Sequence, residues 1–322
     1  MAETVTLALR PYDQFAPLWV GQVETPGINL KLVHDAPLVM DFAEHIDIAE
    51  ISFNRYLLAC SRGEDGLVGI PAFVLRGFRH RNYFVRADSK LESLADLRGK
   101  RLGSNSWPDT GTMWARAAMR DAGVDVGDVQ WVIGTLDEKT PNRPPSPHDA
   151  QPPKGAEFLS GSDTLLGLLK EGKIDAVTTA FAPPVILEKG SWLRRLVRNY
   201  RAAEADYHAR TGVYPGFHII AARRDYAEKR PARVRAVYAA LQASFAIWST
   251  KVLKFGEATP WAVEELETMY RDFGADTPPF GTESAAHRKM LATMCFEQHA
   301  QGLVAKPADP EKLFAAYNAL PK

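Results

Sequence analysis

The order of apolar and polar residues divides the first two thirds of the chain into short strand-like runs separated by helical segments. The strand-like runs lie at residues 5–9, 28–33, 47–52, 70–75, 83–85, 100–103, 129–133 and 174–179. Helical segments are predicted at 91–98, from about 109 with Thr110 as N-cap, and at 158–171 before Gly172. Strands that alternate with helices are typical of α/β folds, so we expect a mainly parallel sheet.

The last third of the chain is mainly helical. From residue 231 to residue 299, apolar side chains recur at the spacing of an amphipathic face, as at Val234, Val237, Tyr238, Leu241, Phe245 and Trp248. We interpret the Met and aromatic positions of these helices as core positions.

One segment fits neither pattern. Residues 137–157 contain six prolines, at positions 141, 144, 145, 147, 152 and 153. Because proline removes a backbone donor and restricts the chain, we predict a long surface loop here. The loop follows a strand end, so we expect a flap over a ligand or an arm that reaches a partner subunit. A surface insertion without a role is the alternative.

The most distinctive chemistry lies between an apolar run and the strand at 83–85. Arg76, Arg79 and His80 occur there within five residues. A turn at Gly77 between two strands would place the three side chains on one strand-end rim. A guanidinium binds a carboxylate through two parallel hydrogen bonds, and histidine transfers protons near neutral pH. This combination suits protonation-driven loss of CO2 from an acid; a solvated basic strand end is the simpler alternative.

Composition and charge narrow the function classes. A chain of 322 residues is long enough for two cores, and 39 basic residues balance 39 acidic ones, so no global field favours nucleic acid or an anionic membrane. Cys60 and Cys295 form neither a disulfide framework nor a metal-ligand spacing. The eight histidines have no metal-binding spacing, and no glycine-rich nucleotide motif follows a strand. We therefore expect no cofactor and no metal, unless distant segments assemble a metal site.

The N-terminal residues predict a location. Met1-Ala2-Glu3-Thr4 leads directly into the first strand, without the basic region, apolar stretch and cleavage site of a signal peptide. Elsewhere the sequence contains no run of the roughly 20 apolar residues that a membrane span needs. We expect a cytoplasmic protein, or one whose signal has been trimmed.

Several short motifs occur in order between about residue 5 and residue 250. The more specific ones are Arg76 with Phe78-Arg79-His80, and Tyr214-Pro215-Gly216-Phe217-His218. The others are Tyr12-Asp13, Ile46 to Ser52, Ile70-Pro71, Leu94 to Gly103, Thr110 with Trp114-Ala115-Arg116, and Leu169 to Ala176. Together these segments resemble the 4,5-dihydroxyphthalate decarboxylase family, which has the type 2 periplasmic-binding-protein fold.

The resemblance implies an α/β protein of two lobes, with mixed, mainly parallel sheets and a ligand cleft between the lobes. Lobe 1 would comprise residues 1–87 together with 217–322, including the C-terminal helices. Lobe 2 would comprise residues 88–216, including the proline-rich loop. Cleft residues in such folds come from strand ends and helix N-termini.

Candidate site residues follow from these positions and from the motifs. For catalysis we predict His80, His218 and Glu50. For substrate binding we predict Arg76, Arg79, Asp13, Tyr12, Ser52, Trp107, Thr110 and Thr112. His218 precedes the apolar run 219–221, at the second crossover that the resemblance implies, so we expect it to meet His80 across the cleft. A histidine satisfied at a strand start is the alternative. Glu50 or Asp13 would orient a histidine or accept a phenolic proton.

The implied reaction is cofactor-independent decarboxylation of a hydroxylated aromatic acid. A general acid protonates the ring carbon that bears the carboxylate, and CO2 then departs to restore aromaticity. Arg76 or Arg79 would hold the carboxylate, and either His80 or His218 would supply the proton. The sequence does not distinguish the two histidines.

The sequence departs from the family pattern at Val74-Leu75 and Gly77, and at Ser106-Trp107-Pro108. Both changes make the expected pocket less polar. We expect the partner to be a small-molecule aromatic carboxylate, either 4,5-dihydroxyphthalate or another hydroxylated aromatic acid. A solute-binding protein for such a carboxylate, or another enzyme of this fold such as a desulfinase or a menaquinone-pathway enzyme, is the alternative. Desulfinases of this kind use a cysteine near the first strand, which this chain lacks. We expect no nucleic-acid or membrane partner. The sequence is compatible with a homo-oligomer but does not determine the oligomeric state.

Overall fold

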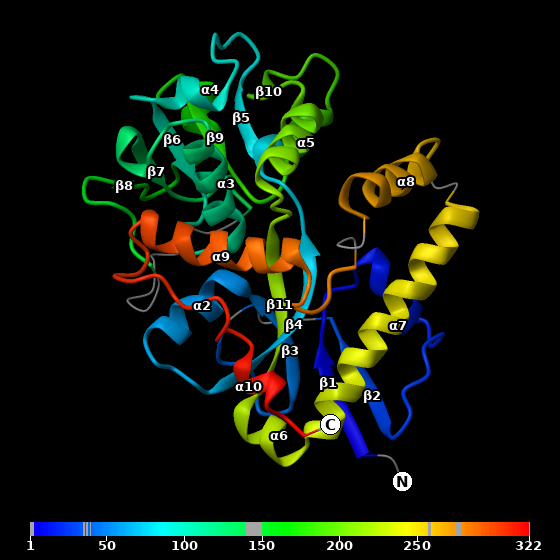
Figure 1. Ribbon diagram of the computed structural model, residues 1–322. Helices are drawn as coiled ribbons and strands as arrows, with labels where there is room; N and C mark the ends of the chain where they lie inside the picture. The colour runs from blue at the N-terminus through cyan, green and yellow to red at the C-terminus, as the bar shows by residue number, and fades with distance from the viewer. Residues whose placement is uncertain are drawn as a thin grey trace. The chain divides into compact units, whose positions relative to one another are not determined.

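The computed structural model describes residues 3–34, 36, 38, 40–139, 150–256, 259–274 and 278–321 (Figure 1). The chain forms two compact units, each built around one β-sheet. Unit 1 comprises Met1–Arg76, Gly216–Ala292 and Ala308–Lys322, and unit 2 comprises Gly77–Pro215 and Thr293–Pro307. The α/β class predicted from the alternating pattern is confirmed.

The sheet of unit 1 has five strands in the order β2-β1-β3-β11-β4. They are β1 (Glu3–Ala8), β2 (Ile28–Val33), β3 (Ile48–Ser52), β4 (Leu67–Arg76) and β11 (Gly216–Arg223). β1 pairs in parallel with β2 and β3, whereas β11 pairs antiparallel with β3 and β4. The start of β11 therefore lies at the same edge of the sheet as the ends of β1 and β3.

Helices of unit 1 cover this sheet with apolar side chains. They are α1 (Ala16–Trp19), α2 (Phe53–Ser61), α6 (Arg224–Lys229), α7 (Pro231–Phe255), α8 (Ala262–Phe273) and α10 (Ala315–Asn318), with the 3-10 helix η1 (Asp13–Phe15). Helix α7, which runs beside β1 and β2 in Figure 1, buries Val234, Val237 and Leu241 in a core shared with Val5 and Leu7. The helical face predicted in the last third is thus confirmed, and each such buried side chain contributes about 1.5–3 kcal/mol to folding.

The sheet of unit 2 has six strands in the order β10-β5-β9-β6-β7-β8. They are β5 (Tyr83–Arg86), β6 (Arg101–Ser104), β7 (Gln130–Ile133), β8 (Glu157–Phe158), β9 (Ala176–Thr178) and β10 (Leu193–Arg195). β6, β7, β8 and β9 pair in parallel, and β5 pairs antiparallel with β9 and β10. Both sheets are therefore mixed.

Short helices connect the strands of unit 2. They are η2 (His80–Asn82), η3 (Leu94–Leu97), α3 (Thr110–Asp121), η4 (Val126–Asp128), α4 (Leu165–Lys170), η5 (Pro184–Leu187) and α5 (Tyr200–Thr211). Helix α9 (Ala285–Ala300) begins in unit 1 and ends in unit 2. The core of unit 2 buries Phe84, Val132, Leu165, Leu169 and Val177.

Strands flank Gly77 as predicted, but they do not belong to one sheet. Strand β4 pairs with β11 in unit 1 as far as Arg76, and β5 pairs with strands of unit 2. Arg76 therefore belongs to a different unit from Arg79 and His80. The local pattern of two apolar runs around a glycine does not reveal that each run pairs with a distant strand.

The division between the units differs from the predicted lobe boundaries in two places. Residues 77–87 belong to unit 2 because β5 pairs with β9 and β10. Residues 293–307 also belong to unit 2. In that segment, Gln301 accepts a hydrogen bond from Arg116 at 2.7 Å, and Glu297 accepts one from Arg120 at 2.7 Å.

The start of one predicted helix and the N-cap of another are also wrong. Phe158 lies in β8, in register with Ile133, and α4 begins only at Leu165. Its N-cap is Thr164, whose side chain accepts the Gly167 N–H and so satisfies one free donor of the first turn. Helix α3 has Asp109 as its N-cap, one residue before the predicted Thr110.

The proline-rich loop is only partly described. Residues 140–149, with four of the six prolines, lie outside the described residues, so the flap or arm stays a prediction. The two remaining prolines precede β8 in irregular structure. Within the described part of the chain, none of the helices combines the length and apolar character of a membrane span.

Candidate functional site

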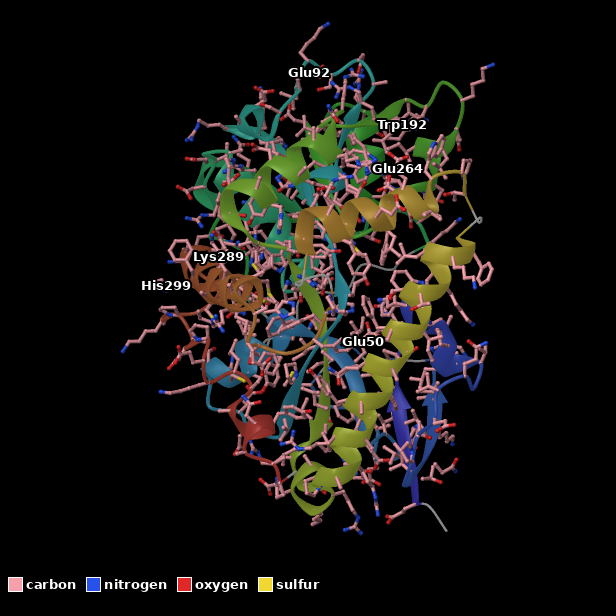
Figure 2. All side chains as sticks on the ribbon, turned by 45° about the vertical axis from the view of Figure 1, so that its right-hand side comes forward. Glu50, Glu92, Trp192, Glu264, Lys289 and His299 are labelled. Atoms are coloured by element: carbon pink, nitrogen blue, oxygen red, sulfur yellow. The ribbon has the colours of Figure 1, made fainter. Side chains whose placement is uncertain are left out.

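Glu50, labelled in Figure 2, is a fully buried carboxylate on β3. It is the centre of a small polar cluster in unit 1. Its Oε1 lies 2.5 Å from Tyr12 Oη and 2.5 Å from His218 Nδ1, and its Oε2 accepts the backbone N–H of Arg10 at 2.9 Å. Tyr12 Oη also lies 3.3 Å from His218 Nδ1. We call Arg10, Tyr12, Glu50 and His218 the Glu50 cluster.

The sheet register brings these distant residues together. On β11, Ile220 lies opposite Glu50, and His218 lies opposite Ser52, two residues along the same face. Arg10 and Tyr12 follow the end of β1, the other neighbour of β3. A buried carboxylate costs several kcal/mol unless its oxygens are hydrogen-bonded, so the three donors offset that cost.

The contacts also set the ionisation of the cluster. Burial raises the pKa of Glu50, but the hydrogen bond and charge of His218, together with Tyr12 and the Arg10 N–H, outweigh it and hold the pKa below its ordinary value. Burial, followed by the charge of Glu50, raises the pKa of Tyr12 far above its ordinary value. At neutral pH, Glu50 is therefore ionised, and Tyr12 is a neutral phenol that donates a hydrogen bond to Glu50.

This arrangement fixes which nitrogen of His218 is available for chemistry. An ionised carboxylate only accepts hydrogen bonds, so the contact with Glu50 requires a proton on Nδ1. The other nitrogen, Nε2, is then the one that can exchange a proton with a ligand. The His218 side chain is 13% exposed while that of Glu50 is 0% exposed, so the histidine is the more accessible member of the pair.

Arg10 was not predicted from the sequence. Its backbone binds Glu50, and its half-buried guanidinium acts on the Tyr12 hydroxyl through charge and a hydrogen bond. The signal that would have identified it is its position directly after the first strand, next to the Tyr12-Asp13 motif, since ligand sites in open α/β sheets form at strand ends.

The other predicted residues of unit 1 lie at strand ends or helix starts. Asp13 is exposed at the start of η1. Ser52 is buried, ends β3 and is the N-cap of α2. Arg76 is half-buried at the end of β4, in register with Gly216. Their roles in substrate binding stay predictions.

In unit 2, Arg79 is half-buried, and its Nη1 donates to the carbonyl oxygen of Ala180 at 2.8 Å. Asn82 donates through Nδ2 to the same oxygen at 3.0 Å and to Thr179 O at 2.9 Å. Burial, with the nearby charge of Arg81, lowers the pKa of Arg79 to about 10, so the guanidinium stays charged at neutral pH.

His80 is buried rather than on a rim. It is 6% exposed, its ring lies 5.3 Å from that of Tyr207, and its Nδ1 has no hydrogen-bond partner among the residues that the structure describes. Burial lowers the pKa of His80 to about 4, so this histidine is neutral at physiological pH. The sequence pattern gave no sign of this burial.

Trp107, Thr110 and Thr112 are all buried around the start of α3. The Trp107 ring lies 3.9 Å from the Arg116 guanidinium and 5.0 Å from the Trp131 ring. Thr112 Oγ1 donates to Asp109 O at 2.9 Å. These contacts stabilise the helix start, and the part of the three residues in substrate binding stays a prediction.

A cavity of about 350 Å³ in unit 2 contains none of the predicted residues. It is lined by side chains that include Arg101, Trp131, Lys154 and Glu157. Within the described ranges, no group of three or more His, Cys, Asp or Glu side chains could hold a metal ion.

Comparison with known sequences supports the resemblance found in the motifs. A family model described as NMT1/THI5 like matches residues 52–141. The chain is 28% identical over 321 residues to a 4,5-dihydroxyphthalate decarboxylase of Comamonas testosteroni, with 96% of each chain covered. It is also 28% identical over 212 residues to a protein of the same name from Pseudomonas putida, covering 63% of this chain and 81% of that one. The resemblance to 4,5-dihydroxyphthalate decarboxylases is confirmed.

Solved structures of similar fold include binding proteins and an enzyme. The aliphatic sulphonate binding protein SsuA from Escherichia coli has a TM-score of 0.55 at 14% identity, covering 97% of this chain and 92% of that one. The desulfurization enzyme DSZB has a TM-score of 0.53 at 16% identity, with 98% of each chain covered. At these identities the likeness concerns the fold, and it confirms the periplasmic-binding-protein-like class.

Proposed function

We propose that the protein is a carboxy-lyase that removes CO2 from a hydroxylated aromatic carboxylic acid, 4,5-dihydroxyphthalate or a close analogue, without a metal or an organic cofactor. The similarity to 4,5-dihydroxyphthalate decarboxylases over nearly the whole chain supports the reaction class. The observation that carries the mechanism is the 2.5 Å contact between buried Glu50 and His218 Nδ1. This contact fixes the His218 ring and leaves its Nε2 as the proton donor.

In the proposed reaction, protonated His218 gives its Nε2 proton to the ring carbon that bears the carboxylate. A hydroxyl group para to that carbon stabilises the cationic ring as its ketone form. The bond between the ring and the carboxylate then breaks, its electron pair restores aromaticity, and CO2 leaves. His218 is left neutral and regains a proton from water. A proton transfer of this kind contributes about 10²- to 10⁴-fold to the rate.

Glu50 supports this step because it remains ionised. Its charge stabilises the imidazolium, and its hydrogen bond fixes the ring of His218. Tyr12 and the Arg10 N–H hold the carboxylate in place. Loss of either hydrogen bond would leave the buried charge of Glu50 less well stabilised.

We assign the proton donor to His218 rather than His80. A histidine with a pKa of about 4 is a neutral imidazole at neutral pH and so lacks the imidazolium proton that the reaction needs. His80 is also buried against Tyr207. For the substrate carboxylate we propose Arg79, whose charged guanidinium is held in a fixed position by Ala180 O. His80 would then have a packing role beside this arginine.

A solute-binding protein is the main alternative. Such a protein needs cations for the carboxylate but has no use for a buried acid–base pair, so the Glu50–His218 contact favours the enzyme. The predicted cytoplasmic location and the oligomeric state stay predictions.

The test is turnover of 4,5-dihydroxyphthalate, followed by chromatography of the expected product, 3,4-dihydroxybenzoate. The wild type should form this product, His218→Gln should form little, and His45→Gln should match the wild type because His45 is exposed. Binding of the acid by the wild type without any product would contradict the proposal and favour a receptor.

A further inference from the structure

Gly111, the second residue of α3, lies directly against the guanidinium of Arg79. A Cβ atom at this position would lie 2.6 Å from Arg79 Nη2, 3.0 Å from Cζ and 3.2 Å from Nε. Contacts under 3.0 Å do not occur between such atoms without a shift, so any side chain at position 111 would displace the guanidinium.

The backbone does not require glycine at this position. Gly111 is not among the residues with positive φ, and it lies in a regular helix. Glycine inside a helix is less favourable than alanine by about 1 kcal/mol. The close approach of Arg79 thus favours glycine at a position where the backbone does not need one.

Two other groups help to hold Arg79 in place. Ala180 O accepts Nη1 of Arg79 at 2.8 Å, and Asn82 Nδ2 donates to the same oxygen at 3.0 Å. Asn82 is itself buried, with a second bond to Thr179 O. One face of the guanidinium thus meets Gly111, and one edge is bound to a carbonyl that is itself anchored. We call Gly111, Asn82 and Ala180 the Arg79 seat.

We propose that Gly111 is a positioning residue for substrate binding: its missing side chain lets the Arg79 guanidinium lie in the orientation that receives the substrate carboxylate. This inference rests on the proposed function, in which Arg79 binds that carboxylate. A guanidinium gains most from a carboxylate when both N–H donors point at it in one plane, so a small displacement weakens binding without removing the charge. The seat would therefore control affinity rather than fold.

The experiment measures the Kd of phthalate (benzene-1,2-dicarboxylate) by titration calorimetry, because this acid lacks the hydroxyl groups that the reaction needs. Arg79→Ala should raise the Kd by about 10- to 100-fold, the loss expected for a charge-assisted contact. Gly111→Ala should raise the Kd by about 10-fold through displacement of the same group. The matched control is Gly127→Ala, also in unit 2, where a Cβ meets no atom within 4 Å; it should bind as the wild type does.

A double variant separates positioning from a general structural effect. In the Arg79→Ala background, Gly111→Ala should change the Kd no further, because the group that it displaces is gone. Gly111→Ala should also unfold at the same or a higher temperature than the wild type, since alanine favours the helix and the displaced atoms end a flexible side chain.

A Gly111→Ala protein that binds phthalate as tightly as the wild type would overturn the inference, as would additive effects in the double variant or a wild type that does not bind phthalate. These results are independent of turnover. A wild type that decarboxylates the hydroxylated acid while Gly111→Ala retains full affinity would leave the proposed function standing and remove only the role of Gly111.

Discussion

Acidification should destabilise the protein through His80, and the size of the effect follows from its burial. Burial lowers the pKa of His80 from 6.5 to about 4, while the unfolded chain keeps the ordinary value. Above 6.5 the residue is neutral in both states and has no effect. As the pH falls from 6.5 towards 4, the unfolded state binds a proton that the folded state does not, so stability is lost.

The expected loss is large enough to measure. One pKa unit corresponds to about 1.4 kcal/mol, so the shift from 6.5 to about 4 corresponds to about 2 kcal/mol at about pH 5 and about 3 kcal/mol below both pKa values. Solvent screens this effect little, because the residue is only 6% exposed.

The assay compares the free energy of unfolding in urea for the wild type and His80→Leu between about pH 7.5 and pH 4.5. Other histidines and carboxylates titrate in both proteins and cancel in the difference. A constant offset from altered packing against Tyr207 also cancels, because it does not depend on pH. The wild type should lose about 2 kcal/mol relative to the variant by about pH 5. A difference that is the same at every pH would refute the burial argument.

Three further predictions concern the cluster, the core of unit 1 and cofactors. Glu50→Gln should lower kcat by about 10²- to 10⁴-fold, because a neutral amide does not stabilise the imidazolium. The control Glu44→Gln, at an exposed site, should keep the wild-type kcat. Equal kcat values in the two variants would contradict the role of Glu50. Gly69→Ala should reduce stability by about 1–3 kcal/mol, since its Cβ would lie 2.6 Å from the Tyr56 ring. The control is Gly66→Ala, because a Cβ at this position meets no atom within 4 Å. Thermal unfolding at the same Tm in both variants would contradict the predicted clash with Tyr56. Turnover should survive dialysis against a strong chelator; activity that is lost and then restored by one divalent ion would establish a metal requirement.

The sequence predicted the elements that depend on local pattern. The strands at 28–33 and 129–133 and the long helix from Pro231 have clear apolar periodicity, and the structure has them close to the predicted bounds. Glu50 and His218 were predicted as separate candidates, and the β3–β11 register brings them into contact.

The errors concern properties that depend on distant pairing and on burial. Arg76, Arg79 and His80 are neighbours in sequence, but β4 and β5 pair in different sheets. The neutral state of His80 comes from burial against Tyr207, more than a hundred residues later in the chain. The need for glycine at position 111 likewise arises from a side chain that only the fold brings there.

The most direct test of the central claim, proton delivery by His218 followed by loss of CO2, is the reaction of 4,5-dihydroxyphthalate in D2O, analysed by NMR. The wild type should release CO2 and form 3,4-dihydroxybenzoate with one deuterium on the ring carbon that carried the lost carboxylate. His218→Gln should form this product at a rate lower by about 10²-fold or more. Recovery of the unchanged acid from the wild type, or equal rates in the wild type and His218→Gln, would contradict the account.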